Sequence, residues 1–244
     1  MFIYILTILL LSIVLILLII HQCKDKFIDN KNIISTHNIN ILKNNLKNKK
    51  NAYFFGKGPT FKIINKKSND DFFVCINDSI NYINQCDLLV INDIETYNRI
   101  NPEKYKNLKY ILTPYYPHTN NSPKKNLDYK YIFNKIYPNF NGYIIIYNLK
   151  TGFSNHKNFI NLYTANSGAL NSLELLLYYI KNIKNYNFYG IGIVKGNGYS
   201  YFFVKNNEYI KKKGNQEYND SRILSIKNNI IKLCTKYNVN YKLN

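Results

Sequence analysis

Several short apolar runs, each followed by Asn, Asp or a Gly-containing turn, most strongly constrain the fold of this chain. Runs of this kind, apolar at nearly every position, are typical of strands buried on both faces of a parallel sheet. The clearest examples are NAYFFG at 51–56, DFFVCIN at 71–77, CDLLVIND at 86–93, KYILTPYY at 109–116, GYIIIYN at 142–148, YNFYGIGI at 186–193 and VNYKL at 239–243.

Two longer segments have the apolar spacing of helices. The first is SGALNSLELLLYYIKNI at 167–183. The second, NDSRILSIKNNIIKLCTKYN at 219–238, begins with a good N-cap candidate, Asn219 or Ser221. Alternation of strands and helices predicts an α/β fold with a Rossmann-like, largely parallel sheet flanked by helices. In such sheets ligands bind at the carboxyl ends of the strands.

The N-terminus predicts a membrane anchor. Phe2 to Ile20 is a continuous apolar run without a charged side chain, long enough as a helix to span a bilayer core of about 30 Å. It has no basic n-region and no small-residue cleavage site, which favours a retained single-pass segment over a cleaved signal peptide. We therefore expect a transmembrane anchor at 1–21, a polar stalk or a first amphipathic helix at 22–50, and a folded domain at 51–244.

The formal charge of +19 does not by itself indicate a nucleic-acid-binding protein. The chain is rich in Asn, Ile, Lys and Tyr, whose codons are AT-rich, and its lysines are scattered rather than gathered in a basic stripe. We do not expect nucleic acid among the partners. The four cysteines form no CxxC pattern and no Cys/His spacing of the zinc type, so neither a zinc site nor a disulfide framework is predicted.

Polar residues at the ends of the predicted strands are the candidates for ligand binding. Gly56 and Gly58 would let the backbone approach an anion and donate amide hydrogens to it, and the alternative is an ordinary tight turn. Asn77 and Asn92 each end a strand, where an amide can bind a nucleoside or form an Asx turn. Asp93 and Glu95 leave open a metal clamp of the kind seen in nucleotide-sugar enzymes.

Together these motifs resemble the sialyltransferases, and most closely the small bacterial lipooligosaccharide enzymes. The turn Gly56-Lys57-Gly58-Pro59-Thr60 stands where that family has Gly-Asn-Gly-Pro-Ser. Asn77 and Asn92 look like the family's nucleotide-binding asparagines, and Asn166-Ser167-Gly168 resembles its Thr-Ser-Gly helix start. Tyr201, in GYSYFF, looks like the tyrosine that steadies the leaving phosphate. The resemblance covers roughly residues 52–243.

The resemblance implies a membrane-anchored glycosyltransferase. It would transfer sialic acid or a related sugar from a CMP-type nucleotide donor to a glycan acceptor, without a metal or other cofactor. The side of the membrane stays open, because Lys24 and Lys26 favour a cytosolic domain by the positive-inside rule, whereas sialyltransferases of the secretory pathway face the lumen.

The chain departs from the family at the general base. The family's histidine precedes the last long helix, but this chain has no histidine after His156. Glu217 is the first candidate for the base, Asp220 the second, with helix capping as its alternative, and Tyr218 the third, because a phenol with a pKa near 10 is a poor base. Two other functions stay open: an inactive nucleotide-sugar-binding protein, and a transferase of the flagellin-glycosylation type.

Overall fold

The computed structural model describes residues 35–58, 60–64, 66–97, 99–115, 140–149, 159–162, 167–191, 200–205, 208–213 and 220–244, together with Ser12. The chain divides into two units, Met1–Ile33 and Ile34–Asn244. Apart from Ser12, the predicted anchor at 1–21 lies outside the described residues. Among the helices that are described, none combines the length and the apolarity needed to cross a bilayer.

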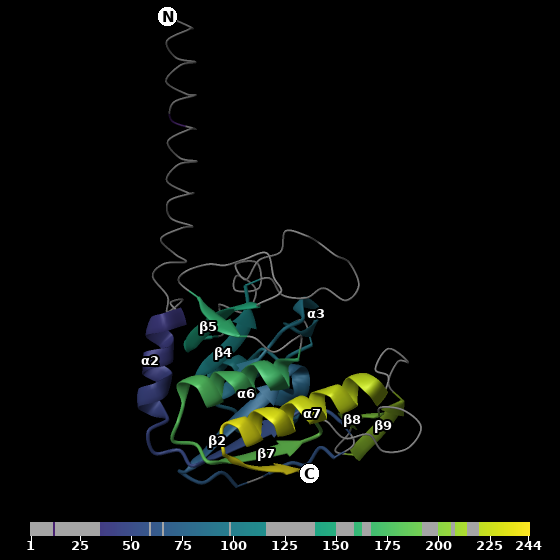
Figure 1. Ribbon diagram of the computed structural model, residues 1–244. Coiled ribbons are helices and arrows are strands. Elements are labelled where there is room, and N and C mark those ends of the chain that lie inside the picture. Colours follow the sequence, from purple (N-terminus) through teal and green to yellow (C-terminus); the bar gives the residue numbers. More distant parts are fainter. Residues whose placement is uncertain are drawn as a thin grey trace, which may run out of the picture. The chain divides into compact units, whose positions relative to one another are not determined.

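An eight-stranded, entirely parallel sheet forms the centre of the second unit (Figure 1). This confirms the predicted α/β class, and every run singled out in the sequence contributes a strand. In spatial order the strands are β10 (Asn240–Leu243), β7 (Asn185–Tyr189), β1 (Asn51–Phe55), β2 (Asp71–Ile76), β3 (Leu88–Val90), β4 (Tyr110–Pro114), β5 (Tyr143–Leu149) and β6 (Ile160–Leu162). A separate antiparallel pair, β8 (Ser200–Lys205) and β9 (Glu208–Lys213), completes the strands.

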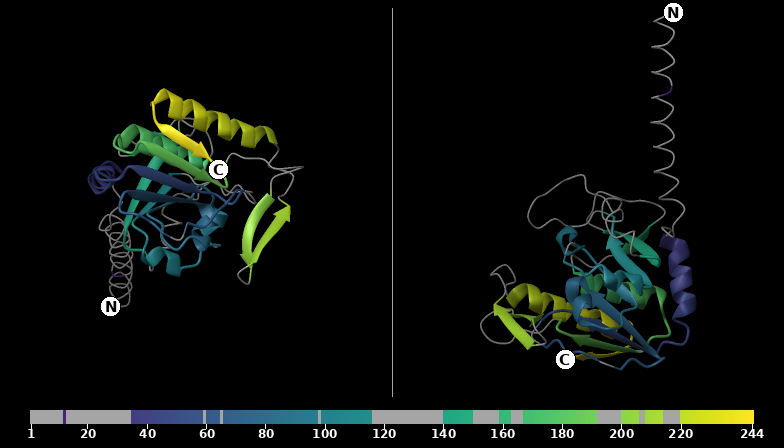
Figure 2. Two further views of the ribbon diagram at one scale, coloured as in Figure 1. Left: turned by 90° about the horizontal axis from the view of Figure 1, so that it is seen from below. Right: turned by 180° about the vertical axis from the view of Figure 1, so that it is seen from behind.

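Helices cover both faces of this sheet (Figure 2, left). One face carries α2 (Ser35–Asn45), α6 (Gly168–Tyr179) and α7 (Asp220–Lys236), whose apolar residues share one core with Phe54, Val74 and Val90. The opposite face carries η1 (Asn77–Tyr82), α3 (Ile94–Tyr97) and α4 (Glu103–Lys106). Because alternate strand residues point to opposite faces, the two layers bury both sets, which explains the continuous apolar runs.

The order of the strands reverses beside β1. The chain proceeds from β1 to β6 in one direction, then returns through α6 to β7, on the other side of β1, and ends in β10. In open parallel sheets the crevice for a ligand lies at such a reversal, outside the carboxyl ends of the strands. The turns after β1, β2 and β7 and the start of α6 are therefore where a functional site is expected.

In the segment at 22–50, for which a stalk and a first amphipathic helix were the alternatives, the described second half forms helix α2. Helix α2 belongs to the folded unit, and its Ile39 and Leu42 are buried in the core of the sheet. The buried Asn38 donates a hydrogen bond from Nδ2 to the carbonyl oxygen of Ile144 in β5, at 2.7 Å. The polar composition of this segment hid three or four apolar positions at helical spacing, which is why the domain boundary was placed too late at residue 51.

Candidate functional site

Two glycine turns cross at the strand reversal. Gly190, after β7, has a φ of +66° and accepts a hydrogen bond from the amide of Gly58, at 2.8 Å. The amide of Gly56 donates to the carbonyl of Tyr189, also at 2.8 Å, and the amide of Gly190 donates to Oγ1 of Thr60, at 3.1 Å. A Cβ on Gly56 would lie 2.5 Å from the carbonyl oxygen of Gly190. Both turns therefore need glycine in order to pack backbone against backbone.

This crossing changes the interpretation of the 56–60 turn. The amides of Gly56 and Gly58, predicted to hold an anion, are donated to backbone carbonyls instead. The missing side chain of Gly56 makes room for Gly190 and not for a ligand. For these two residues the geometry favours the tight-turn alternative. Pro59 lies outside the described residues.

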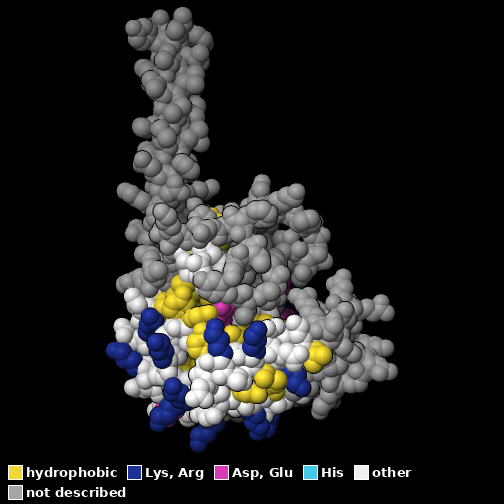
Figure 3. Space-filling view, in the orientation of Figure 1, with side chains coloured by type: hydrophobic (Ala, Val, Ile, Leu, Met, Phe, Trp, Pro, Cys, Tyr) yellow, Lys and Arg dark blue, Asp and Glu magenta, His cyan; other side chains and the backbone are white. Residues whose placement is uncertain are grey.

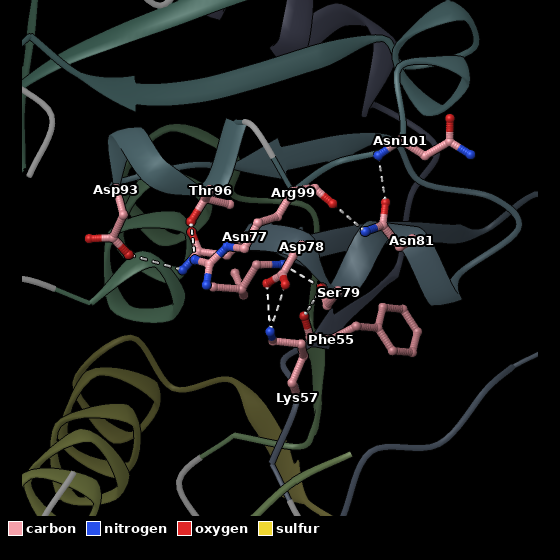
Figure 4. Close-up of polar contacts among 11 residues, drawn as sticks. Phe55, Lys57, Asn77, Asp78, Ser79, Asn81, Asp93, Thr96, Arg99 and Asn101 are labelled. Carbon is pink, nitrogen blue, oxygen red and sulfur yellow. Dashed lines mark hydrogen bonds and ion pairs between the residues drawn. The ribbon is translucent and has the colours of Figure 1, made fainter. Parts of the chain in front are cut away.

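Lys57, between the two glycines, forms a largely buried ion pair with Asp78 at the start of η1. Its Nζ lies 2.7 Å from Oδ1 and 2.7 Å from Oδ2 of the carboxylate, and the two side chains are 12% and 8% exposed. The pair joins the turn after β1 to the turn after β2 (Figure 4). The positive charge of Lys57 is therefore balanced within the protein.

Asn77 occupies an unusual conformation directly after β2. Its φ is +55°, in the left-handed region that non-glycine residues seldom adopt. The side chain donates from Nδ2 to Oδ2 of Asp93, at 3.3 Å, while its Oδ1 is buried and has no hydrogen-bond partner among the described residues. The turn itself is closed by Ser79, whose Oγ accepts from the amide of Ile76 and donates to the carbonyl of Phe55. Asn77 is therefore not the acceptor of an Asx turn.

Asn92 lies in the interior. Its Nδ2 donates to Oδ1 of Asn171 in α6, at 3.1 Å, and the hydroxyl of Tyr147 in β5 lies within hydrogen-bond distance of both amide oxygens, at 2.9 and 3.1 Å. Burial raises the pKa of Tyr147 well above its ordinary value, so the hydroxyl stays a donor. Asn92 is 5% exposed. Its predicted role as a ligand contact is corrected to that of a structural link between β3, β5 and α6.

The start of α6 meets the same edge of the sheet. A Cβ on Gly168 would lie 3.1 Å from Ile76 and 3.3 Å from Val90, the last residues of β2 and β3. Ser167 is the N-cap residue, and its hydroxyl does not cap the helix. The structure thus brings Ser167, Gly168 and Asn77 to the carboxyl ends of β2 and β3. Asn166 lies outside the described residues.

Arg99, which the sequence interpretation missed, lies in the same region (Figure 4). Its Nη2 donates to Oγ1 of Thr96 in α3, at 3.0 Å, and in Figure 4 the side chain passes Asn77 to reach this partner. The carbonyl of Arg99 accepts from Nδ2 of Asn81, whose Oδ1 in turn accepts from the amide of Asn101. The sequence offers one clue, because arginine is rare in this lysine-rich chain.

For the predicted catalytic residues the structure gives only the backbone position or no position. The backbone of Tyr201 pairs with Lys212 in the β8–β9 hairpin, Asp220 is the first residue of α7, and Glu217 lies outside the described residues. No described group of His, Cys, Asp or Glu residues has the arrangement of a metal site. The side chain of Glu95 is not among those described, so the alternative of a clamp with Asp93 stays a prediction.

The face of the sheet covered by α2, α6 and α7 has a mixed surface of lysines and apolar side chains. Its lysines are dispersed among apolar patches (Figure 3). Two hollows of about 460 and 480 Å³ lie there, away from all the predicted site residues. The first is lined by Leu177, Tyr178, Ile180, Lys181, Ile183, Lys184, Tyr186, Tyr237 and Val239.

The chain is thus an α/β protein with one parallel sheet whose strand order reverses beside β1, and polar side chains lie at the carboxyl ends of the strands next to this reversal. Comparisons with known protein families, with curated proteins and with solved structures found no match to this chain. What the chain does must therefore be argued from its own residues.

Proposed function

We propose that this chain is a membrane-anchored glycosyltransferase of the sialyltransferase type, which binds a nucleotide-sugar donor at the carboxyl edge of its sheet. The proposed donor is a CMP-linked sialic acid or a related sugar, the acceptor is a glycan, and the apolar segment at 1–21 is the proposed anchor. The observation that carries the proposal is Asn77. Its Oδ1 is buried and has no hydrogen-bond partner among the described residues, and Asn77 directly follows Ile76, the last residue of β2, against which Gly168 at the start of α6 lies.

An unpartnered buried amide oxygen costs free energy of about 1–3 kcal/mol. A ligand that donates a hydrogen bond to it, through a nucleoside amine or a ribose hydroxyl, would recover that cost. The N-terminus of a helix attracts anions, so the start of α6 at Ser167 and Gly168 suits a phosphate. These two features support a nucleotide at this edge more specifically than the 56–60 turn does.

The proposed reaction is a direct displacement. The oxygen of an acceptor hydroxyl forms a bond to the anomeric carbon of the sugar while the bond from that carbon to the phosphate oxygen breaks. The hydroxyl proton passes to a base, for which Glu217 is the first candidate, and the nucleotide leaves as a monophosphate. Ser167 and Tyr201 are the proposed contacts to the departing phosphate.

A second candidate is a nucleotide-sugar-binding protein without transferase activity. The absence of any histidine after residue 156 favours it. Glu217→Gln separates the two. In a transferase that uses this base, transfer is lost while nucleotide binding is kept, whereas a binding protein shows no transfer even as wild type.

The proposed site is tested by calorimetry on the full-length chain in neutral detergent, with cytidine, uridine and guanosine monophosphates. Asn77→Gly removes the amide and also tolerates the positive φ. Loss of one hydrogen bond predicts a Kd about 2 to 10 times higher. Asn238→Gly is the matched control, because Asn238 also has a positive φ, of +51°, but lies after α7. Equal effects of the two substitutions, or no binding of any nucleotide by the wild type, would refute the proposed site.

A further inference from the structure

Arginine is scarce in this chain. Of its 33 Lys and Arg residues only two are arginine, Arg99 and Arg222. The AT-rich codon usage that favours lysine in this chain does not explain why an arginine stands at the carboxyl edge of the sheet. The two side chains differ chemically, because the guanidinium offers a planar fork of donors that matches a carboxylate or a phosphate in a bidentate way.

The surroundings of Arg99 leave that fork available. The side chain is exposed, and among the described residues its one side-chain hydrogen bond is the one from Nη2 to Thr96. Among the described residues no carboxylate forms an ion pair with it. The nearby Asp78 is balanced by Lys57, and the carboxylate of Asp93 accepts a hydrogen bond from Asn77. In Figure 4 the Arg99 side chain passes Asn77 and its guanidinium lies toward Thr96, whereas the Asp78 carboxylate faces Lys57.

Asn77 adds an acceptor beside this donor fork. Its Oδ1 has no partner in the described part of the chain, so a ligand that fits both residues must carry an oxyanion and, next to it, a hydroxyl or amine hydrogen. A neutral sugar lacks the first group, and an anion without a hydroxyl or amine hydrogen lacks the second.

We propose that Arg99 is the anion-binding residue of this site and that, with Asn77, it selects a ligand bearing a carboxylate or phosphate beside a hydrogen-bond donor. This inference rests on the proposed function for the nature of the ligand, a nucleotide joined to an acidic sugar. The inference adds Arg99, which the family resemblance does not supply. It also makes the negative charge of the ligand the property by which the site distinguishes ligands.

The test compares wild type, Arg99→Gln and Arg99→Lys as full-length chains at fixed ionic strength, by calorimetry with CMP, cytidine and free sialic acid. Losing a charge-assisted hydrogen bond predicts a Kd at least about tenfold higher for the anion that Arg99 holds. Arg99→Lys keeps the charge without the fork, and an intermediate loss is expected. Lys232→Gln, on α7, is the control for removing one positive charge.

The pattern of losses identifies the anion. Weaker binding of CMP with unchanged cytidine assigns the phosphate to Arg99, and weaker binding of sialic acid with unchanged CMP assigns the carboxylate. If Arg99→Gln binds all three ligands as the wild type does, or weakens cytidine as much as CMP, the role of Arg99 is refuted while the nucleotide site stands.

If the wild type binds none of the three, the proposed function fails, and Arg99 is then judged with inorganic phosphate. If phosphate raises the Tm of the wild type and of Lys232→Gln but not that of Arg99→Gln, an anion site at Arg99 is supported. Equal responses of the three proteins would refute it.

Discussion

The ion pair between Lys57 and Asp78 should contribute strongly to stability, and Lys57→Met tests this. The substitution removes the cation from an Asp78 side chain that is 8% exposed. Leaving a buried charge without its partner costs about 3–5 kcal/mol. Because the Lys57 side chain is 12% exposed and some water reaches the pair, we expect the lower end of that range, about 3 kcal/mol. For a domain of this size that corresponds to a drop in Tm of roughly 6–12 °C.

The assay is urea and thermal unfolding of the full-length chain, followed by far-UV circular dichroism. Lys106→Met is the matched control, because Lys106 pairs with Glu103 at the same 2.7 Å but the two side chains are 55% and 67% exposed. We expect it to cost no more than about 0.5 kcal/mol. The double variant Lys57→Met/Asp78→Leu should regain most of the lost stability, since an apolar pair of similar volume is often neutral.

A loss below about 1 kcal/mol for Lys57→Met, or a loss equal to that of the exposed control, would refute the structural role of the pair. Lys57 would then return as a candidate contact to a ligand phosphate, as its sequence position first indicated.

Three further substitutions test the remaining geometry. Gly190→Ala should destabilise the fold by more than about 2 kcal/mol in urea unfolding, because a left-handed φ of +66° is joined by contacts of 2.8 and 2.9 Å to the backbone of Gly58 and Gly56; a loss below about 1 kcal/mol would contradict this. Tyr147→Phe should cost about 1–2 kcal/mol by depriving the buried Asn92 of its donor, and an unchanged unfolding free energy would show that the network is dispensable. Burial raises the pKa of Cys234 to about 12. As the pH rises, the thiol therefore ionises first in the unfolded chain, and the free energy of unfolding falls above about pH 8.5. Cys234→Ala should reduce the slope of this fall between about pH 8.5 and 10. An unchanged slope would exclude the Cys234 thiol as the cause of the fall.

The strands and the parallel sheet were predictable because their determinants are local. A segment such as DFFVCI is buried on both faces, and all of its positions carry that information. Helix α6 was predictable for the same reason. For the segment of helix α2 the sequence left a stalk and an amphipathic helix open, because its few apolar residues are diluted by polar ones and its partner strand β5 begins about a hundred residues later.

The roles of the site residues were harder to predict because they depend on partners far away in the sequence. Gly56 is glycine because of Gly190, and Asn92 is satisfied by Asn171 and Tyr147. No motif around either residue contains that partner. Strand-end position in the sequence pointed to Asn77 and Asn92 but not to Arg99. The division between side chains held by internal hydrogen bonds and those left for the proposed ligand appears only when the turns are placed together.

That division also narrows the search for a catalytic base. Among the described carboxylates of this edge, Asp78 is held by Lys57 and Asp93 accepts from Asn77. Using either as a base would dismantle the geometry that presents the ligand-binding amide. A proton acceptor for the proposed displacement must then come from another part of the chain, and Glu217, in the segment that leads into α7, is the first candidate by its place in the sequence. The edge carries the groups that we propose bind a nucleotide, and its described carboxylates, Asp78 and Asp93, are both engaged, so binding and the proposed transfer are expected to be separable by mutation.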